Sequence, residues 1–363
     1  MTHDYFQHKE CMFTVRYTNV VQECEHLKSV LIEGPNSFRV AEIELEAVPP
    51  GYLLLAPLLV GICGTDLELI DGSMVYLRNG VARYPLSPGH EWVARVLELG
   101  SGVTGFAVGD TVVGEVSVGC DDCSLCSTGN YHRCSDRSET GFMGISGALR
   151  EQMLFPARSA HRVPAGVSLG DAAMTEPLAI AYRAVERAEI SHGEKILVVG
   201  MGTIGMLAAL VLRATGDAHV SFLSDNAYRS KQAEDRGFSA HIPGERYPRV
   251  IEAAGSEGAV REALSALAPG GRLVLAGLTG QPEIPLPVDN IVIGDLEVIG
   301  TLGSPGVWPA VLALLDSQKV HPAELVTHTF RLNEFPEAIE LARDKQSGTG
   351  KILIQVNEGN TDG

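Results

Sequence analysis

The stretch "KILVVGMGTIGMLAALVLRATG" (residues 195–216) joins a short apolar run, a glycine-rich turn and a longer apolar segment. Gly200, Gly202 and Gly205 form the pattern G-x-G-x-x-G between an expected buried strand and an expected helix. In this setting the first glycine makes a tight turn, the second lets the backbone approach a pyrophosphate, and the third permits close helix packing. The helix N-terminus offers free N–H groups to the phosphates. The stretch therefore predicts a dinucleotide-binding βαβ unit.

A dinucleotide site of this kind needs a residue that binds the adenosine ribose, about 20 positions beyond the glycines. Asp225 in "FLSDN" stands at that distance from Gly205 and would accept hydrogen bonds from the ribose hydroxyls. Ser224 is a second candidate for the end of the strand, and it would leave room for a 2′-phosphate that Arg229 could bind. Because Asp225 places a negative charge nearby, we expect NAD to be preferred by a modest margin, with NADP possible. A plain surface turn is the alternative interpretation of Asp225.

The regions around this unit differ in pattern. From about Leu27 to Phe155, short alternating runs broken by Gly and Pro predict an antiparallel, barrel-like β domain. After a helix that begins near Met174, strand patterns at "VSFLSD", "RVIEAAG" and "GRLVLAGL" alternate with helical patterns such as "AVREALSALAPGG". This alternation predicts an α/β region with a mostly parallel sheet. We expect the stretch "DNIVIGDLEVIGTLGS" (289–304) to form an apolar strand pair.

Composition limits the partners. The chain has 363 residues, with 45 acidic and 28 basic side chains and a net charge of −17, which argues against a nucleic-acid ligand. Its apolar segments are shorter than the roughly 20 residues of a bilayer span, so we expect no membrane association. The N-terminus shows no basic region followed by an apolar run, which predicts the reducing cytoplasm. A small-molecule partner is expected, and the first 25 residues look like an extension.

Four of the seven cysteines lie together in "CDDCSLCSTGNYHRC" (residues 120–134). Cys120, Cys123, Cys126 and Cys134 have the spacing C-x2-C-x2-C-x7-C, and two-residue spacers let neighbouring thiolates converge on one Zn²⁺. Four sulfurs saturate the ion, so the site is predicted to be structural. The alternatives are scattered free thiols or a redox couple, and a redox couple needs no third and fourth cysteine.

A second zinc site is predicted from residues that are far apart in the chain. Cys63 lies in "VGICGTD", His90 and Glu91 lie in "SPGHEW", and Glu176 lies in "AMTEPLA" between the two expected domains. Each is weak evidence alone, because a lone Cys is usually a buried apolar residue and a Glu before Pro often starts a helix. Together with a dinucleotide motif and a closed four-cysteine site, they favour a catalytic metal centre.

The chain resembles the zinc-containing medium-chain dehydrogenase/reductase family over nearly its whole length, from about Leu27 to Val356. The resemblance rests on "GICGTD", "PGHE", "VGDTVV", the four-cysteine segment, "EPLA", "GMGTIG", "APGGRLVLAGL" and "KILIQV". The combination "CGTD…GHE…EPL" is similar to the polyol, sugar and threonine dehydrogenase branch. The resemblance implies a GroES-like β barrel in residues 1–178 and 304–363 and a Rossmann domain in residues 179–303. It also implies two zinc ions per chain, and the strands of residues 289–304 would join two subunits in a homodimer or homotetramer.

The resemblance also assigns roles to individual residues. Cys63, His90 and Glu176 match the catalytic-zinc ligands, and Glu91 matches an adjacent acid that can exchange with water at the metal. Thr65 matches the hydroxyl that hydrogen-bonds the substrate alcohol, and Asp66 would orient His90. Glu68 stands where many members have a proton-relaying histidine, so the relay is expected to end at Glu68 or at solvent. The segment before "RVIEAAG" is short, which predicts that one helix of the cofactor domain is trimmed.

The expected reaction is reversible oxidation of a secondary alcohol to a ketone, with hydride transfer to a nicotinamide cofactor. A polyhydroxylated substrate such as a sugar, polyol or cyclitol is expected. A hydroxy amino acid such as L-threonine is the closest alternative. An alternative of another class is a zinc-containing dinucleotide-binding scaffold or sensor without turnover, which would not need Cys63, His90, Glu91 and Thr65 together.

Overall fold

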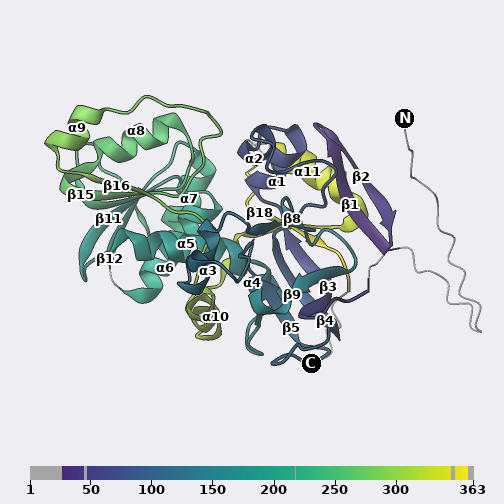
Figure 1. Ribbon diagram of the computed structural model, residues 1–363. Helices are drawn as coiled ribbons and strands as arrows, with labels where there is room; N and C mark the ends of the chain where they lie inside the picture. Colours follow the sequence, from purple (N-terminus) through teal and green to yellow (C-terminus); the bar gives the residue numbers. More distant parts are fainter. Residues whose placement is uncertain (1–26, 45–46, 217, 345–347, 359–363) are drawn as a thin grey trace, which may run out of the picture.

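The computed structural model describes residues 27–44, 47–216, 218–344 and 348–358, so the expected N-terminal extension lies outside the described residues. Two lobes lie side by side, an α/β lobe and a β lobe, and helix α5 (Thr175–Ala188) lies between them (Figure 1). The helix expected from about Met174 is therefore confirmed. In the described part of the chain, no helix has the length and apolar character needed to cross a membrane.

The α/β lobe contains a six-stranded parallel sheet. The strand order is β13-β12-β11-β14-β15-β16, which corresponds to 3-2-1-4-5-6 when β11 is counted as the first strand. The strands are β11 (Glu194–Val199), β12 (Ala218–Leu223), β13 (Ser239–Ala240), β14 (Tyr247–Glu252), β15 (Leu267–Leu275) and β16 (Glu297–Gly300). The parallel sheet predicted from alternating strand and helix patterns is confirmed.

The helices of this lobe follow the predicted alternation. They are α6 (Thr203–Thr215), α7 (Ala227–Asp235), α8 (Glu257–Ser265) and α9 (Val288–Ile293). The described segment 241–246, between β13 and β14, contains no helix, which confirms the trimmed connection. Residues of α6 such as Leu207 and Val211 are fully buried, so most of this helix packs inside the lobe.

The prediction of a strand pair at residues 289–304 is wrong for the first half of this segment. Residues 288–293 form helix α9, and only Glu297–Gly300 form a strand. The run Ile291, Val292 and Ile293 has the β-branched composition of a strand, but Pro287 precedes the helix and accepts hydrogen bonds from the N–H groups of Asn290 and Ile291. Local start signals for a helix therefore outweighed β propensity.

The β lobe is built on a seven-stranded, mainly antiparallel sheet with the order β10-β5-β4-β3-β18-β17, in which β9 also pairs with β3. These strands are β3 (Tyr52–Gly61), β4 (Glu91–Leu99), β5 (Thr111–Gly114), β9 (Met153–Pro156), β10 (Ala160–Arg162), β17 (Val326–Arg331) and β18 (Lys351–Gln355). The last two come from the C-terminal part of the chain, which leaves the α/β lobe and returns. The domain limits at residues 178 and 303 stay a prediction.

Smaller elements complete the β lobe and its border with the α/β lobe. A hairpin pairs β1 (Leu27–Gly34) with β2 (Ser37–Ile43). The remaining strands and helices are β6 (Ser117–Val118), β7 (Ser138–Thr140), β8 (Gly144–Ile145), α1 (Gly64–Asp71), α2 (Val75–Arg78), α3 (Ser124–Ser127), α4 (Leu169–Ala173), α10 (Trp308–Asp316) and α11 (Phe335–Arg343). Short 3-10 helices lie at Tyr131–Arg133, Ala157–Ser159, Pro322–Leu325 and Leu332–Glu334.

One buried apolar cluster extends across both lobes. It includes Leu58 and Val93 of the β lobe, Leu178 of α5, Leu207 of α6 and Trp308 of α10. Full burial of one such side chain stabilises the folded state by about 1.5–3 kcal/mol. The lobes therefore share a core, which fixes the position of the glycine-rich turn relative to the β lobe.

Candidate active site and metal centres

Strand register brings Cys63 and His90 together. Strands β3 and β4 pair in antiparallel fashion with Gly61 opposite Glu91. Cys63 follows the end of β3 and caps α1, and His90 directly precedes β4. Because the strands run in opposite directions, the end of β3 and the start of β4 meet at one edge of the sheet. There, one ligand atom each of Cys63, His90 and Glu91 lies within 4.8 Å of the others.

Asp66 lies behind His90. Its fully buried carboxylate accepts a hydrogen bond from the Cys63 backbone N–H at 2.9 Å, and its Oδ1 lies 3.8 Å from His90 Nδ1. Burial lowers the pKa of His90, but Asp66 and Cys63 together raise it well above its ordinary value. Asp66 lies on the Nδ1 side of the ring, which leaves the other ring nitrogen for a metal, and its carboxylate stands just beyond hydrogen-bonding distance of Nδ1.

A buried ion pair completes this edge of the sheet and was missed by the sequence analysis. Strand β18 pairs with β3 so that Lys351 lies beside Cys63, and its ammonium group forms an ion pair with Glu91. Both side chains are nearly fully buried. Burial lowers the pKa of Lys351, but the charges of Glu91 and Cys63 raise it above its ordinary value. A Cβ at Gly61 would collide with the Glu91 carboxylate and with Lys351, so a larger residue there would displace the ion pair. The sequence shows a Lys at the start of the apolar strand "KILIQV" but not which acid it pairs with.

Glu176 lies nearby but outside the group formed by Cys63, His90 and Glu91. It is buried in the first turn of α5. Burial raises the pKa of Glu176 to about 7, and His90 opposes this shift while Glu91 adds to it. A cation in the site would favour the charged carboxylate. Its role as a zinc ligand stays a prediction.

Thr65 and Glu68 lie on α1 next to the metal-ligating group. Both are partly exposed, and their spacing of three residues places them on the same face of the helix. Burial and the neighbouring Asp71 raise the pKa of Glu68. The structure therefore brings the predicted proton acceptor and the predicted end of the relay to one helix face.

The four cysteines of residues 120–134 converge as predicted. All four ligand atoms lie within 4.8 Å of one another, and the Sγ–Sγ distances are 3.9 Å for Cys120–Cys126, 3.6 Å for Cys123–Cys126 and 3.7 Å for Cys123–Cys134. A disulfide would require about 2.05 Å. A tetrahedron with zinc–sulfur bonds of about 2.3 Å has edges of about 3.8 Å, so the four thiols fit a closed zinc site.

The cysteine segment is hydrogen-bonded to the part of the chain that passes from the α/β lobe to α10. Tyr131, between the third and fourth cysteines, donates a hydrogen bond to the buried Glu115 and accepts one from the Gly306 N–H at 3.1 Å. Glu115 also lies 2.9 Å from His161 Nε2, and the His161 ring stacks on Trp308 with centroids 5.4 Å apart. The segment therefore contacts the chain where it passes from the α/β lobe towards α10.

The glycine-rich turn has the geometry that the sequence predicted. Gly200 has a φ of 90°, which favours glycine, and a Cβ there would lie 2.6 Å from the Ala254 Cβ. A Cβ at Gly205 would overlap the carbonyl oxygen of Gly200, so the turn and the helix pack in direct contact. Gly202 is the N-cap of α6, which directs the free N–H groups of this helix towards the turn. The turn fits a pyrophosphate.

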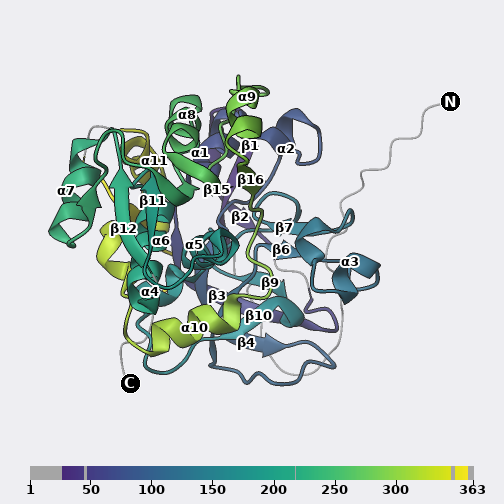
Figure 2. The ribbon, with the colours of Figure 1, turned by 90° about the vertical axis from the view of Figure 1, so that its left-hand side faces the viewer.

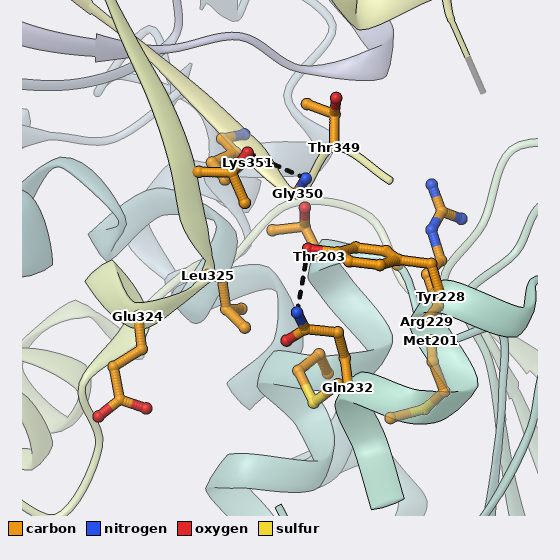
Figure 3. Close-up of a pocket in the computed structure, with 13 residues that line it drawn as sticks. Met201, Thr203, Tyr228, Arg229, Gln232, Glu324, Leu325, Thr349, Gly350 and Lys351 are labelled. Atoms are coloured by element: carbon orange, nitrogen blue, oxygen red, sulfur yellow. Dashed lines mark hydrogen bonds between the residues drawn. The ribbon is translucent and has the colours of Figure 1, made fainter. Parts of the chain in front are cut away.

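A pocket of about 70 Å³ opens beside this turn, between the two lobes (Figure 3). Its walls come from the turn and α6, from α7, and from the returning C-terminal segment, including Thr203, Tyr228, Arg229, Glu324 and Lys351. Tyr228 accepts a hydrogen bond from Gln232 Nε2 at 3.0 Å, which holds its ring across the pocket. Lys351 therefore connects the pocket with the metal-ligating group.

Comparisons with known proteins agree with this geometry. The model of the alcohol dehydrogenase GroES-like domain matches residues 49–165, and the zinc-binding dehydrogenase model matches residues 203–317. The sorbitol dehydrogenase of Halalkalibacterium halodurans is 32% identical over 296 residues, which cover 77% of this chain and 84% of that protein. The chain belongs to the zinc-containing medium-chain dehydrogenase/reductase family. The expected fold class, a GroES-like barrel with a Rossmann domain, is confirmed.

Further relatives of the dehydrogenase support the same assignment. The erythritol/L-threitol dehydrogenase of Mycolicibacterium smegmatis is 32% identical over 360 residues. The aligned region covers 92% of this chain and 97% of that protein. A zinc-binding dehydrogenase of Sinorhizobium meliloti bound to NADP has a TM-score of 0.84 and 25% identity, with 92% of this chain and 100% of that one covered. An Escherichia coli alcohol dehydrogenase with NADH has a TM-score of 0.84 and 26% identity, with 91% and 99% covered. The dehydrogenase uses zinc and a nicotinamide dinucleotide.

Proposed function

We propose that the dehydrogenase reversibly oxidises a secondary hydroxyl of a polyhydroxylated compound, a polyol, sugar or cyclitol, to a ketone. The observation that carries this proposal is the convergence of Cys63, His90 and Glu91 at the edge of the β3–β4 pair, next to Thr65. The sorbitol and erythritol/threitol dehydrogenases among the relatives support the substrate class.

We assign a separate role in this reaction to each residue of the site. Zinc, when bound by Cys63 and His90 with Glu176 or water, supplies Lewis-acid polarisation that lowers the pKa of a hydroxyl. Thr65 accepts the alcohol proton and passes it along α1 towards Glu68 or solvent. Asp66 orients His90 through its Nδ1 side. Lys351 forms a buried ion pair with Glu91, which would keep this carboxylate charged and paired beside a bound zinc ion.

A screen with both oxidised cofactors tests this proposal. Sorbitol, erythritol, inositols, L-threonine and simple secondary alcohols are each mixed with the enzyme and NAD or NADP, and the nicotinamide absorbance is followed. We expect turnover with at least one polyhydroxylated compound and a higher kcat/KM there than with simple alcohols or L-threonine. Turnover restricted to L-threonine would refute the substrate class, and no turnover with any alcohol or the matching ketones would favour a binding protein.

Thr65 gives the proposal a more specific test. We expect Thr65→Val to lower kcat by about a hundredfold, because proton transfer by a positioned group contributes typically about 10²–10⁴-fold. Thr65→Ser keeps the hydroxyl and is the matched control, with kcat within a few-fold of the wild type. Steady-state kinetics with the best substrate of the screen measures both variants. Equal rates for the valine and serine variants would show that Thr65 carries no proton.

We also propose that the dehydrogenase is a homodimer, or a tetramer built from dimers, joined through β16. This strand lies at the edge of the six-stranded sheet and pairs only with β15 among the described strands. Exposed apolar side chains surround it: Val288, Val292, Ile293 and Leu302 are 61%, 72%, 85% and 48% exposed. Helix α9 stands at the end of the α/β lobe away from the β lobe in Figure 1 and at the top of the molecule in Figure 2. An apolar edge strand is an aggregation risk unless it pairs.

Light scattering at micromolar concentration checks this assembly. The wild type is expected to have twice or four times the mass of one chain, and Ile293→Asp is expected to shift the mass towards the monomer. Val108→Asp changes an equally apolar residue that is 66% exposed in the β lobe, and it is expected to leave the mass unchanged. A monomeric wild type would contradict the proposal.

A further inference from the structure

The end of β12 decides which residue faces the adenosine ribose. Leu223 is the last residue of β12, lies opposite Val199 of β11, and accepts a hydrogen bond from the Gly200 N–H at 2.8 Å. Ser224 therefore lies level with the first glycine of the phosphate-binding turn. Its hydroxyl accepts a hydrogen bond from the Asn226 N–H at 3.3 Å, and it is partly buried. Ser224 occupies the position where NAD-binding proteins of this fold carry an acid.

Asp225 is placed differently. It stands between Ser224 and Asn226, whose side chains both take part in the start of α7, and it is exposed. Within the described ranges, its carboxylate accepts no hydrogen bond and forms no ion pair. Asn226 caps α7 by accepting a hydrogen bond from the Arg229 N–H at 3.0 Å, so α7 begins directly after Asn226 and Asp225 lies in the connection outside the helix. The carboxylate is thus directed to solvent rather than to the ribose.

Arg229 lies on the other side of the same space. A Cβ at Gly202 would be 3.6 Å from its Nη1 and 3.9 Å from its Cζ, so the guanidinium group rests against the phosphate-binding turn. Among the residues that the structure describes, this group donates no hydrogen bond and forms no ion pair. Figure 3 shows Arg229 beside Tyr228 on the α7 side of the pocket. The carboxylate of the pocket lining, Glu324, lies 3.9 Å from Arg236 instead.

We propose that the dehydrogenase prefers NADP(H) to NAD(H), with the adenosine 2′-phosphate between the Ser224 hydroxyl and the Arg229 guanidinium group. A guanidinium group binds phosphate oxygens through paired, charge-assisted hydrogen bonds, and the small serine leaves space for the phosphate. This inference rests on the proposed nicotinamide-dependent function. It departs from the modest preference for NAD that Asp225 suggested in the sequence and selects the alternative with Ser224 and Arg229.

Calorimetry with adenosine fragments tests the inference without turnover. The wild type is expected to bind 2′,5′-ADP at least about tenfold more tightly than 5′-AMP, because hydrogen bonds to a charged group change affinity by about ten- to a hundredfold. Arg229→Ala is expected to remove most of this preference and to change 5′-AMP binding less than about twofold. Ser224→Asp is expected to reverse it, since the new carboxylate repels the phosphate. Asp225→Asn, the matched control, keeps the wild-type ratio.

Three results would contradict the inference, and they differ in what they imply for the proposed function. Preference of the wild type for 5′-AMP, with tighter 2′,5′-ADP binding in Asp225→Asn, would overturn the inference and make Asp225 the deciding residue. Turnover in the alcohol screen with NAD alone would do the same and would leave the proposed function standing. Absence of binding by either nucleotide would contradict both the inference and the dinucleotide-dependent function.

Discussion

Replacement of Cys63 by alanine is expected to lower kcat/KM for alcohol oxidation by about a thousandfold or more. The variant loses one thiolate of the catalytic-zinc group, and a bound metal supplies several kcal/mol of transition-state stabilisation, which corresponds to about three powers of ten in rate. The Cys63 backbone N–H still reaches Asp66, so α1 keeps this contact. The thermal midpoint is therefore expected to change by only a few degrees.

Two measurements on the same preparation separate the outcomes for Cys63→Ala. Kinetics with the best substrate of the screen gives kcat/KM, and metal analysis gives the zinc content, which is expected to fall by one ion per chain. A variant that keeps both its turnover and its zinc content would show that Cys63 holds no metal. A variant that unfolds would be replaced by Cys63→Ser, which keeps the size of the side chain.

Replacement of Cys123 by serine is expected to act on folding first. A structural zinc site contributes on the order of 10 kcal/mol of folding free energy. Since 1 kcal/mol shifts the midpoint of a domain of 150–250 residues by about 2–4 °C, we expect Tm to fall by about 10 °C or more. Because Tyr131 accepts a hydrogen bond from the Gly306 N–H, unfolding of the cysteine segment is also expected to destabilise the chain segment that connects the α/β lobe with α10. Differential scanning calorimetry measures the change.

The neighbouring Ser127 provides the matched control for this variant. It is the last residue of α3, the short helix that Cys123 caps, is exposed, and donates a hydrogen bond from its hydroxyl to the carbonyl oxygen of Ser124. Ser127→Ala is therefore expected to keep both the midpoint and the zinc content. If Cys123→Ser kept its midpoint but lost turnover, the structural and catalytic assignments of the two metal centres would have to be exchanged.

The features predicted correctly from sequence are those fixed by neighbours along the chain. The four cysteines span fifteen residues, and their spacing alone brings the thiols to one point. Gly200 and Gly205 are likewise required by contacts within or close to one turn, so the order of the residues alone indicates the dinucleotide site. Cys63 and His90 were candidates by residue type, the family resemblance assigned their roles, and the β3–β4 register explains why they meet.

The features that the sequence did not reveal depend on register or on one-residue shifts. Lys351 reaches Glu91 only because β18 returns to pair with β3, and nothing near either residue in the sequence indicates that pairing. The end of β12 could be placed at Ser224 or Asp225 from sequence, whereas the structure ends the strand at Leu223, which pairs with Val199, so that Ser224 is the first residue beyond it. At residues 288–293, β-branched residues suggested a strand where the start of the segment favours a helix.

The central claim, that one zinc performs chemistry while another holds the cysteine segment together, is tested most directly by stepwise removal of metal from the wild type. Zinc content, kcat and thermal midpoint are followed together during dialysis against a chelator. We predict two zinc ions per chain at the start, loss of turnover in step with removal of one of them at a nearly unchanged midpoint, and a fall of the midpoint with removal of the other. Full turnover by enzyme that holds a single zinc ion in its cysteine site would contradict the claim.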